Sequence, residues 1–332
     1  MYGDGVLLDP NRERTDVVGM LVRQKDRPNA ALLDPRLAQG RAQTLGVLSE
    51  ETYKLSTGDE TVSLLEYLDA HKDELDEKNA RIVFLMLKDI REMKKIPMEE
   101  YIAYEQLLVE ADDVWHTAKE TSDFALFCPL LEKIFDFQKK MAAYCAPEMH
   151  PYNYCLNKYE DGLTMEKCDE FFAALRSRLV PLIKRIGESE QLSNACVKGD
   201  FDEREQEKFA LELMKTMGID LDHCGLGTTE HPFTTSFGSH HDVRITTNYS
   251  SEDLSSSLFS VIHEGGHAIY ELGCKDEYNH TMLAGGVSMG IHESQSRFFE
   301  NLIGRSEAFI SHIYPKVKEF FPEQLEGVTA ND

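Results

Sequence analysis

The residues best suited to chemistry in this sequence lie close together between residues 258 and 271. His263, Glu264 and His267 form the pattern His-Glu-x-x-His. Positions four residues apart lie one turn apart on the same face of an α-helix, so both histidines can bind one metal ion. Neutral imidazoles suit Zn²⁺, which lowers the pKa of a bound water towards ~7 so that Glu264 can take its proton. The pattern therefore predicts a zinc centre that activates water, with Glu264 as the general base.

The residues around this pattern are typical of an α-helix. A capping box is expected at 250–253, apolar residues repeat at helical spacing after it, and Gly273 lies where a C-terminal cap is expected. Gly265 and Gly266 each cost a helix about 1 kcal/mol relative to alanine. A purely structural helix with two surface histidines, the alternative interpretation, gains nothing from them. We therefore expect backbone or substrate to approach the helix closely there.

A catalytic zinc usually has three protein ligands, so one more ligand is needed. The candidates are Glu271, Asp276, Glu277, His280, His292 and Glu293. Glu271 lies on the same helical ridge as the histidines and cannot easily complete a tetrahedron with them. Glu293 lies on the next expected helix, after a Gly-rich turn, where an antiparallel return is natural. Spacing favours Glu293 and leaves His292 as its main competitor.

Most of the chain shows helical periodicity, and one stretch indicates a strand. Helices are expected from Arg41 onwards, along 64–75, over 82–93, 97–115 and 124–144, from Thr164 to about Ile186 with a kink at Pro181, over 202–218 and 289–303, and from Ser306 to about Phe321. The β signal spans 237–249, and its centre, Val243–Thr247, alternates as a half-buried strand should. Residues 1–40 are poorly patterned. The sequence thus predicts a mainly α fold with a small β-sheet beside the His-Glu-x-x-His helix.

Composition limits the partners and the compartment. The 332 residues carry a formal net charge of −24, which argues against nucleic acid and against an anionic membrane as partners. No apolar run approaches the ~18 residues of a membrane span, and the first residues lack the pattern of a secretory signal. The seven cysteines form no Cys-x-x-Cys pair. Free thiols in a reducing cytoplasm are the preferred interpretation.

Three weaker signals have structural alternatives. His240 and His241 could form a second metal site, but adjacent residues on a strand point to opposite faces, so we expect none there. His231 is held extended by the proline that follows it, and by itself it indicates only a loop histidine. Arg244 suits an internal ion pair of this acidic chain about as well as a substrate contact.

Four blocks, in this order, resemble the M32 metallocarboxypeptidases, the thermostable carboxypeptidase Taq family. The blocks are His231-Pro232-Phe233, Asp242-Val-Arg244-Ile-Thr246, His263-Glu264-Gly-Gly-His267 and His292-Glu293-Ser294-Gln295. The likeness runs from about Arg41 to Asp332. It implies a helical gluzincin-type metallopeptidase domain over 41–332, with a long substrate groove and a small sheet.

The resemblance also implies roles for individual residues. The implied metal ligands are His263, His267 and Glu293, with Glu264 as general base and acid, and the implied substrate-binding residues are His231, Asp242, Arg244 and His292. It implies zinc, which cobalt can replace. It further implies a cytoplasmic homodimer that removes C-terminal residues from peptides with broad specificity.

The chain departs from the family in two places. Members run to roughly 500 residues, whereas this chain lacks the later Ile-Arg-x-x-Ala-Asp and Gly-x-x-Gln-Asp-x-His-Trp segments, which are associated with the substrate's terminal carboxylate and the groove. The usual Trp-Asp-containing first helix is not found in residues 1–40. We therefore expect the C-terminal part of the family fold to be missing. Two alternatives stay open: a metal-binding fragment impaired in catalysis, and an endopeptidase or aminopeptidase of the gluzincin type.

Overall fold

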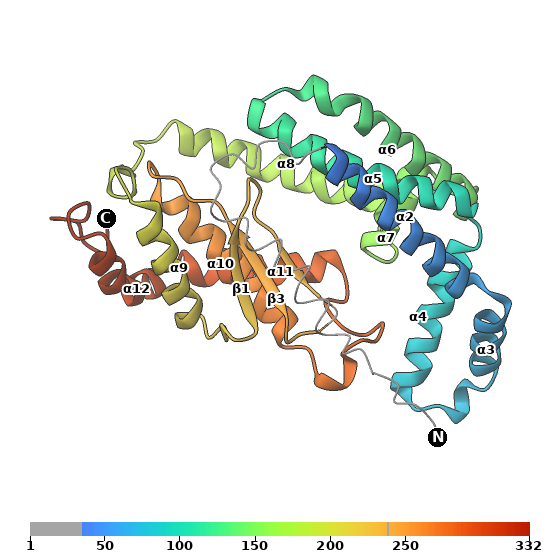
Figure 1. The fold of residues 1–332 in the computed structure, drawn as a ribbon. Helices are drawn as coiled ribbons and strands as arrows, with labels where there is room; N and C mark the ends of the chain where they lie inside the picture. Colours follow the sequence, from blue (N-terminus) through green and yellow to red (C-terminus); the bar gives the residue numbers. More distant parts are fainter. Residues whose placement is uncertain (1–34, 238) are drawn as a thin grey trace. The chain divides into compact units, whose positions relative to one another are not determined.

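The computed structural model describes residues 35–332 apart from residue 238. Most of the segment 1–40, which we expected to be poorly patterned, lies outside the described residues. The described part consists of eleven α-helices, α2 to α12, several short 3-10 or π-helical turns, and one three-stranded sheet (Figure 1). The predicted fold class, mainly α with a small sheet, is confirmed.

The described chain divides into two compact units. The first consists of the residues up to Glu51 together with Glu99–Ile134. It holds most of α2 (Pro35–Thr57) and α5 (Met98–Thr121) and the first half of α6 (Phe124–Cys145). Within it, Arg41 on α2 forms an ion pair of 2.6 Å with Asp113 on α5. The second unit, Thr52–Met98 with Phe135–Asp332, contains the sheet and every candidate site residue.

Most of the expected helices are present, with small changes at their ends. The second unit contains α3 (Asp59–Ala70), α4 (Glu77–Met93), α7 (Pro151–Tyr159) and α8 (Met165–Gly187). Thr164 caps α8 as predicted. The predicted end of α5 at Trp115 was too early, because the helix continues to Thr121. No pattern predicted α7, whose start is capped by the ring of His150.

The sheet has the strand order β1-β3-β2. Its strands are β1 (Cys224–Thr228), β2 (Thr234–Ser236) and β3 (Val243–Thr247), with β3 parallel to β1 and antiparallel to β2. Val243 and Ile245 are buried while Arg244 is half-buried on the other face, so the alternation predicted for this strand is confirmed. The other two strands were missed, since β1 contains two glycines and β2 is only three residues long.

The sheet belongs to a core built around α10 (Leu254–Leu272). This helix packs against β3, against α9 (Glu203–Thr216) and against α11 (Met289–Arg297) (Figure 1). Its cap is Asp253, which accepts a hydrogen bond from the Ser255 N–H, so the capping box predicted from Ser250 was wrong by one turn. The expected C-terminal cap at Gly273 is confirmed.

The end of the chain adds two elements to this core. The helix predicted over 289–303 is an α-helix only in α11, and it continues as the π-helix η5 (Phe298–Gly304). The helix α12 (Glu307–Phe320) follows, capped by Ser306 as predicted. Edge contacts between aromatic rings, such as Phe201 with Phe321 at 5.3 Å, join this end to the segment before α9.

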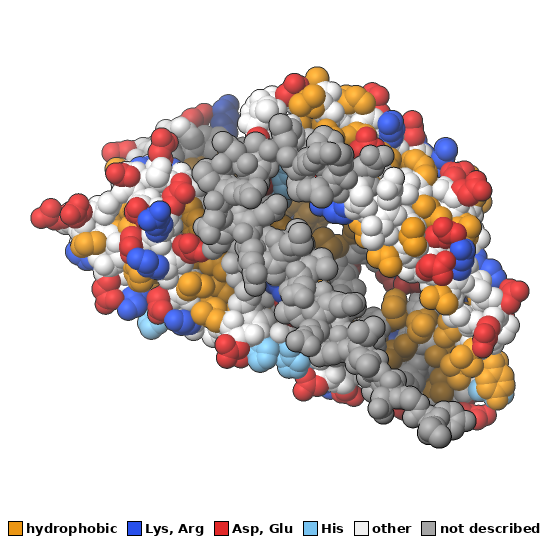
Figure 2. Space-filling model, in the orientation of Figure 1, with side chains coloured by type: hydrophobic (Ala, Val, Ile, Leu, Met, Phe, Trp, Pro, Cys, Tyr) orange, Lys and Arg blue, Asp and Glu red, His pale blue; other side chains and the backbone are white. Residues whose placement is uncertain are grey.

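Charged side chains are spread widely over the described surface. Figure 2 shows acidic side chains over the visible face, with basic and apolar ones between them. None of the described helices combines the length and the apolar content that crossing a membrane requires.

Candidate metal centre

Three predicted ligands come together where α10 faces α11. Potential ligand atoms of His263, His267 and Glu293 all lie within 4.8 Å of one another. Glu293 Oε2 lies 3.7 Å from His263 Nε2 and 3.4 Å from His267 Nε2. Ligands placed tetrahedrally around zinc are separated by about 3.4 Å. Two imidazoles and a carboxylate at these separations fit a divalent transition metal. Three protein ligands leave further coordination positions open to water or substrate.

The close approach of α11 to α10 depends on Gly266. A Cβ at this position would lie 2.8 Å from Ser296 Cα and 3.0 Å from Gln295 O, which are backbone atoms of α11. The expectation that backbone approaches the helix at the glycines is therefore confirmed for Gly266. At Gly265 a Cβ would meet side-chain atoms, chiefly of Met217. Of these two glycines, Gly266 is the one whose missing side chain lets the helix that carries Glu293 approach the histidines.

A carboxylate on η5 orients the first histidine. His263 Nδ1 lies 2.9 Å from Glu300 Oε2, so its ring donates there and presents Nε2 to the metal position. The guanidinium of Arg305 in turn donates to Glu300 Oε1 at 2.8 Å, and that of Arg297 to Oε2 at 3.1 Å. Burial opposes ionisation of Glu300, but these bonds and that of His263 hold its pKa below the ordinary value. A carboxylate in this position fixes the ring of a metal ligand and raises its basicity.

A longer relay orients the second histidine. His267 Nδ1 lies 2.6 Å from His292 Nδ1, and His292 Nε2 lies 2.7 Å from Glu271 Oε1. When both rings are neutral, His267 Nδ1–H donates to His292 Nδ1, and His292 Nε2–H donates to Glu271 Oε1. The Nε2 atom of His267 then remains free to bind a metal. Burial, then the charges of His292 and His263, lower the pKa of His267 to about 4. The ring is therefore neutral near pH 7, as a metal ligand must be.

Glu264 lies on the same helix and is buried. Its Oε2 accepts a hydrogen bond of 2.7 Å from Thr234 Oγ1 on β2. Burial raises the pKa of this carboxyl and the nearby Glu293 adds to the shift, while the Thr234 hydrogen bond and His263 partly offset it. A carboxylate with a raised pKa beside a metal position is suited to accept and return a proton.

The predicted substrate-binding residues differ in the groups that they contact. His231 lies between β1 and β2, near enough to Glu264 to lower the pKa of that carboxyl through its charge. Arg244 donates two hydrogen bonds to Asp242, at 2.8 and 3.2 Å, and its guanidinium lies 4.8 Å from the centre of the Phe237 ring. His292 lies beside His267 instead, inside the relay.

Sequence reasoning missed three residues that support the centre. Glu300 follows Glu293 by seven residues, which on a regular α-helix returns to the same side, but it lies in the π-helix η5, which departs from that spacing. Glu271 was considered as a metal ligand, but its carboxylate contacts His292 and the Gly286 N–H. Thr234 gave no signal, since β2 itself was not predicted.

Comparisons with known proteins identify one family. The profile described as carboxypeptidase Taq (M32) metallopeptidase matches residues 29–332. Carboxypeptidase 1 of Bacillus subtilis is 36% identical over 296 residues, which cover 89% of this chain and 59% of that protein. Thermostable carboxypeptidase 1 of Pyrococcus furiosus is 37% identical over 298 residues, covering 89% and 58%. The chain thus spans about three fifths of the length of these relatives.

Solved structures agree with the sequence comparisons. The crystal structure of the M32 carboxypeptidase from Deinococcus radiodurans has a TM-score of 0.79 and 34% identity, covering 90% of this chain and 60% of that one. The metallocarboxypeptidase 1 of Trypanosoma cruzi has a TM-score of 0.76 and 28% identity, covering 96% and 64%. The similarity extends over nearly all of this chain in each case. The chain belongs to the carboxypeptidase Taq (M32) metallopeptidase family.

Proposed function

We propose that this protein is a zinc metallocarboxypeptidase that hydrolyses C-terminal peptide bonds with broad specificity. One observation carries the proposal: buried Glu264, with its raised pKa, lies on the same helix as two histidines that converge with Glu293. The curated relatives are carboxypeptidases by name. A divalent ion bound by these residues would supply Lewis-acid activation of water and of the scissile carbonyl.

The chain's own residues would then move one proton. Glu264 Oε2 takes the proton of the attacking water and returns it to the leaving amine. The Thr234 hydroxyl holds that oxygen in place. His263 and His267 keep their Nε2 atoms available because their Nδ1–H groups donate hydrogen bonds to Glu300 and to His292.

Substrate contacts belong to the same proposal. His231, Asp242 and Arg244 are expected to contact the peptide, and a substrate carboxylate would have to compete with Asp242 for the Arg244 guanidinium. For His292 the relay favours a positioning role. Replacement of zinc by cobalt, a homodimer and a cytoplasmic location rest on the family resemblance. All seven cysteines are free in the structure, which supports a reducing compartment.

The test is release of free amino acid from an N-blocked dipeptide, with zinc, by this chain and by Glu264→Gln. The proposal expects release that the substitution abolishes and that C-terminal amidation of the substrate prevents. Hydrolysis of the amidated peptide would favour an endopeptidase. Stoichiometric zinc without hydrolysis would indicate a metal-binding protein impaired in catalysis, the alternative that the partial coverage of the relatives keeps open.

A further inference from the structure

A second group of metal-ligating side chains lies outside the centre described above. Potential ligand atoms of His240, His241 and Asp276 lie within 4.8 Å of one another. His240 Nε2 lies 2.8 Å and His241 Nε2 2.9 Å from the same oxygen, Asp276 Oδ1. We propose that these three residues bind a second divalent transition-metal ion, which joins the turn between β2 and β3 to the loop that follows α10.

The backbone of the turn makes this chelate possible. We expected no site here because neighbouring strand residues point to opposite faces, but that reasoning does not apply: His240 and His241 lie in a turn before β3 begins at Val243. Their ring centres are 4.0 Å apart and the ring planes differ by 49°. Both rings can therefore direct a nitrogen to one point.

The donor set selects the class of ion. Two imidazoles with one carboxylate suit Zn²⁺, Co²⁺, Ni²⁺ or Cu²⁺, whereas Mg²⁺ and Ca²⁺ prefer oxygen ligands alone. Around zinc, neighbouring ligands are separated by about 3.4 Å, so Asp276 must withdraw by about 0.5 Å from each imidazole. Its side chain is 82% exposed, on the short 3-10 helix η4 (Asp276–Tyr278), and can move that far.

Without an ion, the hydrogen-bonding groups of His240 and His241 are only partly satisfied. A single carboxylate oxygen serves both imidazoles. The side chain of His240 is 8% exposed, and its Nδ1 is buried without a hydrogen-bond partner in the described part of the chain. The turn is nevertheless already attached to the loop, since the His240 N–H donates to Asn279 Oδ1 at 3.1 Å. An ion would thus enter a site whose two sides are held together beforehand.

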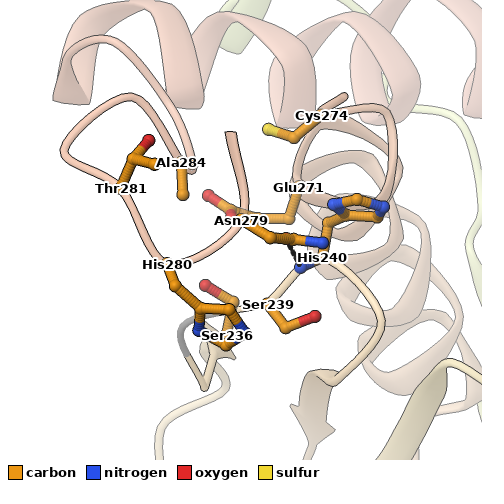
Figure 3. A pocket seen from close by; sticks show the side chains of 10 residues that line it. Ser236, Ser239, His240, Glu271, Cys274, Asn279, His280, Thr281 and Ala284 are labelled. Atoms are coloured by element: carbon orange, nitrogen blue, oxygen red, sulfur yellow. Dashed lines mark hydrogen bonds between the residues drawn. The ribbon is translucent and has the colours of Figure 1, made fainter. Parts of the chain in front are cut away.

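One pocket and one loop lie between this second site and the first metal centre. His240 and Glu271 line one pocket of about 200 Å³, whose wall includes the loop residues Asn279 to Thr281 (Figure 3). The same loop reaches Gly286, whose N–H donates to Glu271 Oε1. An ion held by His240, His241 and Asp276 would therefore fix one wall of this pocket. Its role is structural, because Glu271, the buried carboxylate in the described lining of this pocket, is already bound by His292 and by the Gly286 N–H.

The test is metal stoichiometry, measured by calorimetric titration of the metal-free protein with Zn²⁺ and by metal analysis after gel filtration. The proposal expects two equivalents in the unaltered chain and one in His241→Ala and in Asp276→Asn. Both altered side chains are at least half exposed, so the variants should fold, and circular dichroism checks this. His312→Ala, which removes an exposed histidine from α12, is the control and should keep two equivalents.

A double variant separates the two sites. His263→Ala with His267→Ala should still bind one equivalent, and adding His241→Ala should abolish it. Zn²⁺ should also raise the thermal unfolding midpoint of the double variant, but not that of the variant that carries His241→Ala in addition. No binding by the double variant, or two equivalents in His241→Ala, would each overturn the proposal. None of these outcomes depends on peptidase activity.

Discussion

Replacing Gly266 by alanine should loosen the metal centre without touching a ligand. The added Cβ would lie 2.8 Å from Ser296 Cα, 3.0 Å from Gln295 O and 3.1 Å from Phe299 Cβ. Two of these are backbone atoms of α11, so the helix must move away. Overpacking of this kind costs about 1–3 kcal/mol, whereas alanine gains about 1 kcal/mol in helix propensity. The net expectation is a loss of about 1 kcal/mol in the free energy of unfolding, with Glu293 displaced from the histidines.

The adjacent glycine provides a matched control. A Cβ on Gly265 would meet Met217 Cε at 2.7 Å and Ile219 Cδ1 at 3.1 Å, both at the ends of side chains. The methionine end can rotate away at little cost, because its side chain is unbranched and flexible. Gly265→Ala should therefore keep or raise the free energy of unfolding, by up to the about 1 kcal/mol that alanine gains in helix propensity. It changes the same helix, and the same motif, by the same single methyl group.

Two measurements test this pair of substitutions. Urea unfolding of the metal-free proteins compares their stability, and competition with a chromophoric chelator compares their zinc affinity. Gly266→Ala should be the less stable of the two and should bind zinc at least about tenfold more weakly, since a ligand has moved. Equal stability and equal zinc affinity for the two variants would refute the argument that α11 is positioned by backbone contact at Gly266.

Three further predictions concern the groups around the ligands. Glu300→Gln should weaken zinc binding by about 10- to 100-fold, because it removes the anionic acceptor of His263 Nδ1; an unchanged affinity in the chelator assay would contradict the relay. With Glu264 as the base, kcat/KM should rise with pH through the raised pKa of its carboxyl, so the acid limb lies above the usual range of a glutamate. Thr234→Val removes a hydrogen bond that lowers this pKa and should move the limb to higher pH. Thr235→Val, one residue along the strand and on its other face, should not move the limb, and equal profiles for the two variants would argue against the assignment.

The sequence predicted the local parts of the site and missed the long-range ones. The His-Glu-x-x-His helix, its end at Gly273 and strand Val243–Thr247 follow from periodicity and composition, and the structure confirms them. Glu293 was favoured over His292 by spacing, and the structure brings Glu293 to the ligand atoms of both histidines. The strand that carries Thr234 was not predicted, because three residues contain too little pattern to identify. Its place depends on pairing with β3.

The two relays show why ligand residues alone do not define this centre. Both histidines come from α10, but their Nδ1 atoms are held from different elements, one by Glu300 on η5 and the other through His292 on α11. Glu300 comes into place as α11 continues into the π-helix η5, which departs from the α-helical spacing that a sequence pattern assumes. Glu271 completes the second relay from α10 itself. The zinc affinity should therefore respond to changes of Glu300 on η5 and of His292 on α11 as well as to changes of the ligands, because both contacts determine where the imidazoles point.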